Sequence, residues 1–239
     1  MTKAPAIDAL SDTLPPLERI SHDTLAMRVH RGMRDMLMTG QVQPGQKLTL
    51  RGLAGALGTS LMPVREAVHR LAVEGALEAL PNRTIRVPVM TKSRFRELRT
   101  IRLALEGLAV ETAAATFSAA ALPGMAKLNA VFGRSLERRR PDYAEAFRAN
   151  KEIHFTVYEA AGMPQLVTMI ESLWLQIGPV LYMSMLTRAK ERAQSPARDW
   201  HEALIQALRD HDAAAARAAL EGDLMSAGDH ILAEGDLPD

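Results

Sequence analysis

The sequence of 239 residues contains no cysteine, which excludes disulfide bonds, thiolate metal sites and cysteine nucleophiles. Aromatic residues make up only 4%, which argues against β-sandwiches and barrels, folds that depend on aromatic and β-branched residues. No run of 18 apolar residues occurs, and the first 20 residues contain no continuous apolar stretch, so we expect neither a membrane span nor a signal peptide. These absences predict a soluble, cytoplasmic protein that is mainly helical.

Charge is nearly balanced over the whole chain but is divided unevenly along it. The formal net charge is +1, yet residues 1–92 contain 12 Lys and Arg against 8 Asp and Glu, and residues 93–239 contain 17 against 20. The first part therefore carries +4 and the second −3. Hydrophobic residues make up 47%, enough for a packed core. A basic part joined to an acidic part indicates two domains with different tasks.

Residues 1–20 are rich in proline and polar groups, and we interpret them as a mobile arm. The pattern of residues 21–90 then predicts a helix that ends at Gly40, a turn at 43–46, a short helix capped by Thr49, and a second helix capped by Ser60. Two extended pieces follow, over 77–80 and 85–89, and predict a small hairpin. Helices joined by a tight turn and followed by a hairpin predict a winged helix-turn-helix.

Residues 91–239 show only helical periodicity. A long helix is predicted over 94–116, and prolines and glycines divide the remainder into further helices. We therefore predict an all-helical bundle of about six helices, large enough to enclose a pocket.

Basic side chains lie where a winged helix-turn-helix would meet DNA. Arg65 and His69 lie opposite the apolar face of the second helix, and Arg51 lies at the start of the preceding helix. Arg83 at the hairpin tip and Arg86 beside it could reach the backbone or a flanking groove. Isolated arginines on helices are often only solvated surface, so this pattern alone leaves DNA binding open.

The run LTLRGLAGALGTSLMPVREAVHRLAVEGALEALPNRTIRV resembles the winged-helix domain of the GntR family of bacterial transcription regulators. The family pattern at the start of the second helix is Ser-Arg-Thr-Pro-Val-Arg-Glu-Ala, and Leu61 and Met62 replace its Arg and Thr. The resemblance implies that Arg51 and Arg65 contact double-stranded operator DNA, and that Leu61 could meet a thymine methyl in place of the lost arginine contact. The residues predicted to face DNA are Arg51, Ser60, Leu61, Met62, Arg65, His69 and Arg83.

Residues 93–232 resemble the FCD ligand-binding domain of the FadR subfamily. The resemblance rests on the segments NKEIHFTVYEAAGMPQL and WHEALIQALRDHDAAAARAALEGDL, and on Arg102 with Leu105-Glu106 on the linking helix. Many members of this family hold a divalent metal, and the resemblance assigns the ligand positions to Asn150, His154, His201 and Asp223.

Two of these positions depart from the common pattern, since Asn150 is a neutral donor and Asp223 replaces a histidine. Asn150 and His154 are four residues apart and share a helix face, whereas only the resemblance links His201 to Asp223. Two imidazoles and one carboxylate suit Zn²⁺, Ni²⁺ or Mn²⁺. Open coordination positions would let a small carboxylate effector bind the metal. Arg102 could pair with that effector or form a salt bridge with Glu106, and the sequence favours neither.

These observations predict a homodimeric, ligand-responsive transcription regulator, in the first place a repressor, and not an enzyme. Three alternatives stay open: a helical metal-dependent hydrolase built on His154, His201 and Asp223, a metal-free regulator of a larger ligand, and an adaptor whose winged module contacts protein.

Overall fold

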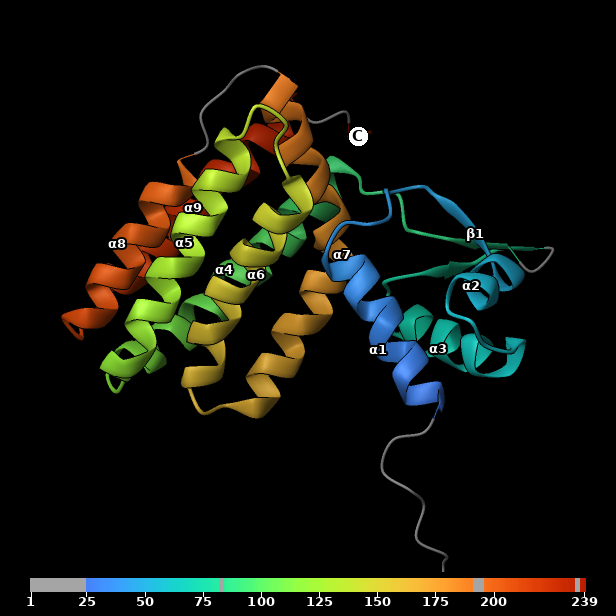
Figure 1. The fold of residues 1–239 in the computed structure, drawn as a ribbon, viewed down its shortest axis with the longest axis horizontal. Coiled ribbons are helices and arrows are strands. Elements are labelled where there is room, and N and C mark those ends of the chain that lie inside the picture. The colour runs from blue at the N-terminus through green and yellow to red at the C-terminus, as the bar shows by residue number, and fades with distance from the viewer. Residues whose placement is uncertain (1–24, 82–83, 191–195, 235–236) are drawn as a thin grey trace, which may run out of the picture.

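A computed structural model describes residues 25–81, 84–190, 196–234 and 237–239. The helices form two groups, a smaller N-terminal group that includes the strands and a larger all-helical group (Figure 1). The expected arm at 1–20 and the predicted wing residue Arg83 lie outside the described residues.

The N-terminal group contains the predicted helix-turn-helix. Thr49 caps α2 as expected, because its side-chain oxygen accepts a hydrogen bond from the backbone N–H of Gly52 at 3.0 Å. Ser60 occupies the N-cap position of α3, but its side chain makes no capping hydrogen bond. The elements are α1 (Leu25–Met38), β1 (Lys47–Thr49), α2 (Leu50–Ala56), α3 (Leu61–Val73), β2 (Glu78–Ala79) and β3 (Thr84–Arg86).

The small sheet has three strands, so the prediction of a two-stranded hairpin was incomplete. β3 is central and pairs antiparallel with β2 on one side and with β1 on the other, where Leu48 lies opposite Ile85. Strand β1 has three residues and a single apolar side chain, too short for a period-2 pattern. Strand β1 forms only because it pairs with β3, and the sequence near β1 gives no sign of that pairing.

The six helices α4 to α9 make up the second group, in agreement with the predicted bundle. Helix α4 packs against α6, α7 and α9, and α5 packs against α6 and α8. The helices are α4 (Lys92–Ala114), α5 (Leu122–Glu137), α6 (Tyr143–Ala160), α7 (Pro164–Lys190), α8 (Ala197–Arg209) and α9 (Ala213–Glu234).

Helix α7 is the long central helix of the molecule. Within the described ranges it is the one helix long and apolar enough to cross a membrane by length and composition, and half of that apolar window is buried inside the protein. One such helix is weak support for a membrane span, because core helices of soluble domains have the same composition.

The two groups share one core. A single cluster of buried apolar residues runs from Met33 and Leu71 in the N-terminal group to Val110, Tyr158 and Trp174 in the bundle. Helix α1 packs against α7, and the two approach each other closely at Gly178, where an added Cβ would lie 2.8 Å from the backbone oxygen of Leu37.

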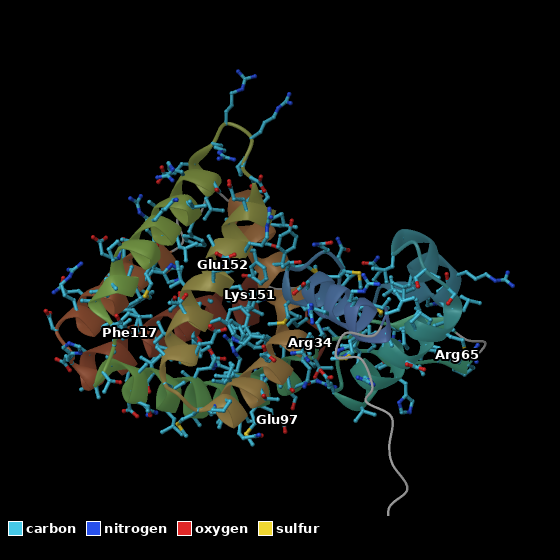
Figure 2. The ribbon with its side chains drawn as sticks, turned by 60° about the horizontal axis from the view of Figure 1, so that its bottom comes forward. Arg34, Arg65, Glu97, Phe117, Lys151 and Glu152 are labelled. Carbon is cyan, nitrogen blue, oxygen red and sulfur yellow. The ribbon has the colours of Figure 1, made fainter. Side chains whose placement is uncertain are left out.

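Polar contacts at this junction connect α7 to the C-terminal end of α3. Arg34 on α1 donates to Glu74 and to Glu171, both at 2.9 Å, and Figure 2 shows Arg34 where the two groups meet. Gln176 on α7 donates to the backbone oxygen of Glu74 at 3.2 Å and accepts from Arg94 at 2.9 Å. Since Glu74 is the C-cap residue of α3, the orientation of α3 is tied directly to α7.

We predict that Gly178→Ala weakens the junction between the groups. The new methyl group would meet the main chain of α1, which cannot rotate away as a side chain could, so α1 must shift. We expect the free energy of unfolding, measured by urea denaturation, to fall by about 1–3 kcal/mol.

The matched control is Gly124→Ala in α5, where an added Cβ meets nothing within 4 Å. Helix propensity alone should make this variant equal to the wild type or more stable by up to about 1 kcal/mol. Equal stability of the two variants would show that the approach of α1 to α7 is not tight.

Candidate functional site

Helix α3 has a buried face and an exposed face. Val64, Val68 and Leu71 are buried in the shared core, and Arg65 and His69 lie exposed on the other side. Arg65 points outward at the end of the N-terminal group away from the bundle (Figure 2). This exposed face is therefore accessible to a duplex.

The start of α3 presents apolar side chains to solvent. Leu61 is 39% exposed and Met62 is 63% exposed. Arg51 on α2 and Ser60 are exposed as well, so every predicted DNA-facing residue within the described ranges lies at the surface. Arg86, by contrast, is paired with Glu78 on the neighbouring strand at 2.6 Å and does not extend freely toward a groove.

Three of the predicted metal ligands come together inside the bundle, each from a different helix. Potential ligand atoms of His154 (α6), His201 (α8) and Asp223 (α9) all lie within 4.8 Å of one another, and all three residues are buried. Nε2 of His154 is 3.1 Å from Oδ2 of Asp223, and Nε2 of His201 is 3.9 Å from the same oxygen. Two imidazole nitrogens thus converge on one carboxylate oxygen.

A neighbouring amide determines the tautomer of His201. Oδ1 of Asn129 is 3.1 Å from Nδ1 of His201, and the amide nitrogen of Asn129 donates to the backbone oxygen of Arg198 at 3.1 Å. Since the amide oxygen can only accept, the proton of His201 lies on Nδ1 and the lone pair on Nε2. Nε2 is buried and has no hydrogen-bond partner among the residues that the structure describes. An imidazole held in this way by an outer partner is typical of a metal ligand.

His154 is oriented by a comparable series of hydrogen bonds. The hydroxyl of Tyr158 donates to Oε2 of Glu106, so its oxygen accepts from Nδ1 of His154 at 3.1 Å. The lone pair on Nε2 of His154 then faces Asp223, and a lone pair 3.1 Å from a carboxylate is favourable only when a proton or a metal cation lies between them. The donor set therefore fits a divalent metal.

Burial and charge set the protonation of the cluster. Burial lowers the pKa of His201 to about 4, with the nearby Asp223 carboxylate opposing the shift and His154 adding to it. Burial acts to raise the pKa of Asp223, but the hydrogen bond to His154 and the charges of the two histidines and Arg102 outweigh it and lower that pKa. Near neutral pH, His201 is neutral and Asp223 is ionised, as metal ligation requires.

Arg102 forms the salt bridge that was one of its two predicted roles. Its Nε and Nη2 atoms donate to the two carboxylate oxygens of Glu106 at 2.6 and 3.2 Å, and both side chains are buried. Burial acts to lower the pKa of Arg102, but the carboxylate of Glu106 overrides this effect and raises it. Glu106 also accepts from Nε1 of Trp174 at 3.2 Å.

The cluster opens into a cavity of about 510 Å³ that is formed by the bundle helices. Arg102 and Asn150 line it together with His154 and Asp223. Asn150, the fourth predicted ligand, is half-buried one turn before His154 on α6. The cavity thus brings the predicted effector residue and three of the four predicted ligands to one place.

Three supporting residues escaped the sequence reasoning. Tyr158 continues the spacing of four from Asn150 and His154 on one helix face, a signal that could have indicated it. Trp174 is buried in the shared core, and it also lines the cavity and donates to Glu106. Asn129 comes from α5, 72 residues before His201, and no spacing relates the two.

Comparison with known proteins identifies the class. Residues 25–87 match the gntR family of bacterial regulatory proteins, and residues 97–224 match the FCD domain. The chain therefore belongs to the GntR family of DNA-binding transcription regulators, with an FCD domain after the helix-turn-helix.

Individual relatives agree with this class. The chain is 31% identical over 169 residues to the HTH-type transcriptional regulator McbR of Escherichia coli, covering 71% of this chain and 76% of the relative. It is 26% identical to the gluconate operon transcriptional repressor of Bacillus subtilis, covering 85% of this chain and 83% of that one. The solved structure of E. coli McbR/YncC superimposes with a TM-score of 0.80 at 28% identity, covering 89% of this chain and 98% of that structure. These relatives are transcription regulators, so the protein is a regulator and not an enzyme.

We predict that Glu106→Gln strongly destabilises the protein. The variant leaves the buried guanidinium of Arg102 without a counter-charge and weakens the acceptor for Tyr158 and Trp174. Removing one partner of a buried ion pair costs about 3–5 kcal/mol, and we expect a loss of that order in urea denaturation.

Glu221→Gln provides a matched control, because Arg217 and Glu221 form an Arg–Glu pair with the same spacing of four at the surface. There we expect a loss below about 1 kcal/mol. A similar small loss for Glu106→Gln would mean that the buried pair does not hold the bundle together.

Proposed function

We propose that the protein is a ligand-responsive repressor, with a DNA-reading domain over residues 21–90 and an effector-binding and dimerisation domain over 91–239. The observation that carries this proposal is the cavity: the metal-ligand cluster opens into it, and the enclosing bundle shares its core with the exposed recognition helix. The relative from Bacillus subtilis is named as the gluconate operon transcriptional repressor, which supports repression.

On the DNA side, Arg65 is assigned to base reading and Arg51 to a phosphate or base contact. Both are exposed, and Arg65 lies on the outer face of α3, from which an arginine can read guanine O6 and N7 in the major groove. The remaining proposed contacts are Ser60, Leu61, Met62, His69 and Arg83.

In the helical domain, His154, His201, Asp223 and Asn150 would hold the metal, with Zn²⁺, Ni²⁺ and Mn²⁺ as the candidates. The orphaned, buried Nε2 of His201 and the two outer hydrogen bonds support this assignment. When bound, the metal would supply a positive centre with open positions for an oxygen ligand.

The charges around the cavity favour a small carboxylate effector only together with the metal. Within the described lining, Arg102 is paired with Glu106, and Arg198 is 3.1 Å from Glu137. Asp199 and Asp223 add two further carboxylates. Without a bound cation the cavity is thus not positive, and a carboxylate would gain little from entering it.

Helix α7 is the proposed route from effector to DNA. The ring centroids of Trp174 on α7 and His154 are 5.6 Å apart. On the same helix, Glu171 accepts from Arg34, and Gln176 donates to the backbone oxygen of Glu74. A shift of α7 on effector binding would therefore move the C-terminal end of α3.

A homodimer would present two DNA-reading domains to an operator with two-fold symmetry. The exposed side of α4 carries Ile101 and Leu108, which are 38% and 43% exposed, with the half-buried Leu105 between them. We propose this stripe as the surface that a second copy covers, because a helix surface in a monomer is normally polar.

The DNA assignment predicts that Arg65→Ala weakens binding to duplexes that the wild-type protein selects from a random library. One lost bidentate base contact is worth about 1–3 kcal/mol, so we expect affinity to fall by about 5- to 150-fold in a gel shift.

Arg134→Ala, at an exposed position on α5, is the control and should bind as the wild type does. Light scattering on the same samples should give the mass of two chains. Unchanged affinity of Arg65→Ala would remove Arg65 from the base-reading role.

The metal assignment predicts about one equivalent of divalent metal in gently purified protein, measured by elemental analysis. Asp223→Ala and His201→Ala should lose it. Asn129→Ala should weaken metal affinity by about 10–100-fold, because it frees His201 to adopt the wrong tautomer.

His69→Ala removes an exposed histidine far from the cluster and should keep the full metal content. A wild-type protein without metal, or an Asp223→Ala variant with full content, would contradict the site.

A further inference from the structure

Residues 237–239 lie against the first residue of α4, where the linker formed by residues 87–91 enters the bundle. The backbone N–H of Lys92 donates to the backbone oxygen of Pro238 at 2.8 Å, and Nζ of Lys92 is 3.4 Å from Oδ1 of Asp239. The first N–H groups of a helix have no partner within the helix, and Pro238 satisfies one of them. Residues 237–239 therefore complete the N-terminal end of α4.

An apolar cluster holds both the linker and residues 237–239. Met90 of the linker is buried in this cluster, and Leu237 packs against it as a partly buried member. The other buried members are Phe95 and Leu98 of α4, Ile177 and Val180 of α7, and Ile231 of α9. The cluster thus connects the linker and residues 237–239 to three helices of the bundle.

Helix α9 brings residues 237–239 to this place. Nη1 of Arg99 on α4 is 2.7 Å from Oδ1 of Asp229 on α9, and an added Cβ at Gly228 would lie 2.8 Å from Cδ of Arg99. Asp239, further along the chain than Asp229, contacts Lys92, which precedes Arg99 on α4. This part of the chain therefore runs antiparallel to the start of α4 and ends at the linker.

We propose that residues 237–239 are a strap, a short segment that keeps the linker on the bundle and limits the movement of the DNA-reading domain. The contacts of α7 with Arg34, Leu37 and Glu74 hold α1 and the end of α3. The linker, which joins the two groups covalently, is held by the apolar cluster and by the two contacts of Lys92. The strap contributes to all of these linker contacts.

The strap is weak enough to open while the bundle stays folded. Leu237 is only partly buried, and Pro238 and Asp239 are exposed. A segment with few buried apolar contacts opens at a lower free energy than the core of the domain. An open strap would free the linker to change its direction, and the orientation of the DNA-reading domain would change with it.

The strap has one consequence for DNA binding, and this consequence rests on the proposed function. In a dimer whose DNA-reading domains have fixed orientations, the operator must present its two half-sites at one spacing. Movement at the linkers would let the same two domains adapt to another spacing. The strap therefore determines how strictly the protein selects the half-site spacing.

Leu237→Asp tests the strap, because it places a charge against the apolar cluster and leaves the buried residues of that cluster unchanged. Limited digestion of the native full-length protein with trypsin should cleave after Lys92 about tenfold faster than in the wild type. Cleavage of a native protein follows the population of its open form, and the partial burial of one leucine accounts for a change of this size.

Met163→Asp is the matched control, because it places the same charge at an apolar side chain that is 39% exposed and lies outside the cluster. It should be cleaved after Lys92 at the wild-type rate. Cleavage after Arg134, within α5, reports unfolding of the bundle and should not change in either variant. An equal increase at Arg134 and Lys92 in Leu237→Asp would show that Leu237 supports the whole bundle, which contradicts the strap.

Gel shifts test the consequence for DNA, with operator duplexes that the wild-type protein selects from a random library. One base pair inserted between the half-sites should lower wild-type affinity by about 5- to 150-fold, as a mismatched base pair does. For Leu237→Asp the loss should be smaller, below about fivefold.

An unchanged rate of cleavage after Lys92 in Leu237→Asp would overturn the strap. Faster cleavage with the wild-type response to the inserted base pair would overturn its role in orienting the DNA-reading domains. If the wild-type protein selects no operator with two half-sites, the proposed dimeric regulator fails and the consequence for DNA fails with it. The digestion uses no DNA, so it decides on the strap itself in every case.

Discussion

The interactions of one buried carboxylate hold the helical domain in its arrangement. Glu106 on α4 is fully buried and accepts hydrogen bonds from Arg102, from Tyr158 on α6 and from Trp174 on α7. An ionised carboxylate in an apolar interior is tolerated only when its oxygens are satisfied, so the three helices must meet at this point. Through Tyr158 the same carboxylate also determines which nitrogen of His154 faces the metal-ligand cluster.

Helix α7 connects this network with the DNA-reading part of the chain. One side of α7 supplies Trp174 to the buried network, and Glu171 and Gln176 contact the N-terminal group. The tight approach at Gly178 makes the two parts one packed unit. Close packing transmits small displacements, because neither interface can yield without opening a void or a clash. The fold therefore supplies a physical connection between an effector cavity and a recognition helix.

Much of the fold could be predicted from the sequence, because its signals are local. Helical periodicity, Thr49 as a cap and the break before α3 depend on residues within one or two turns of each other. The six-helix bundle and the helix-turn-helix followed from such signals. Strand β1 did not, because a three-residue strand exists only through pairing with β3. Ser60 was expected to cap α3 through its side chain, and this expectation was also wrong. Ser60 does occupy the N-cap position, but its hydroxyl makes no capping hydrogen bond, because the position of a residue in the chain does not determine how its hydroxyl is oriented.

The sequence by itself determined the donor types that are available for a metal, imidazole and oxygen without any thiolate, and it placed Asn150 and His154 on one helix face. Only the tertiary structure decided that His201 and Asp223 meet His154, that Asn129 orients His201, and that Arg102 is bound to Glu106. These contacts join side chains from different helices, and their formation depends on how the helices pack. Helix packing is a property of the whole core, whereas a local pattern reports only the face that each helix buries.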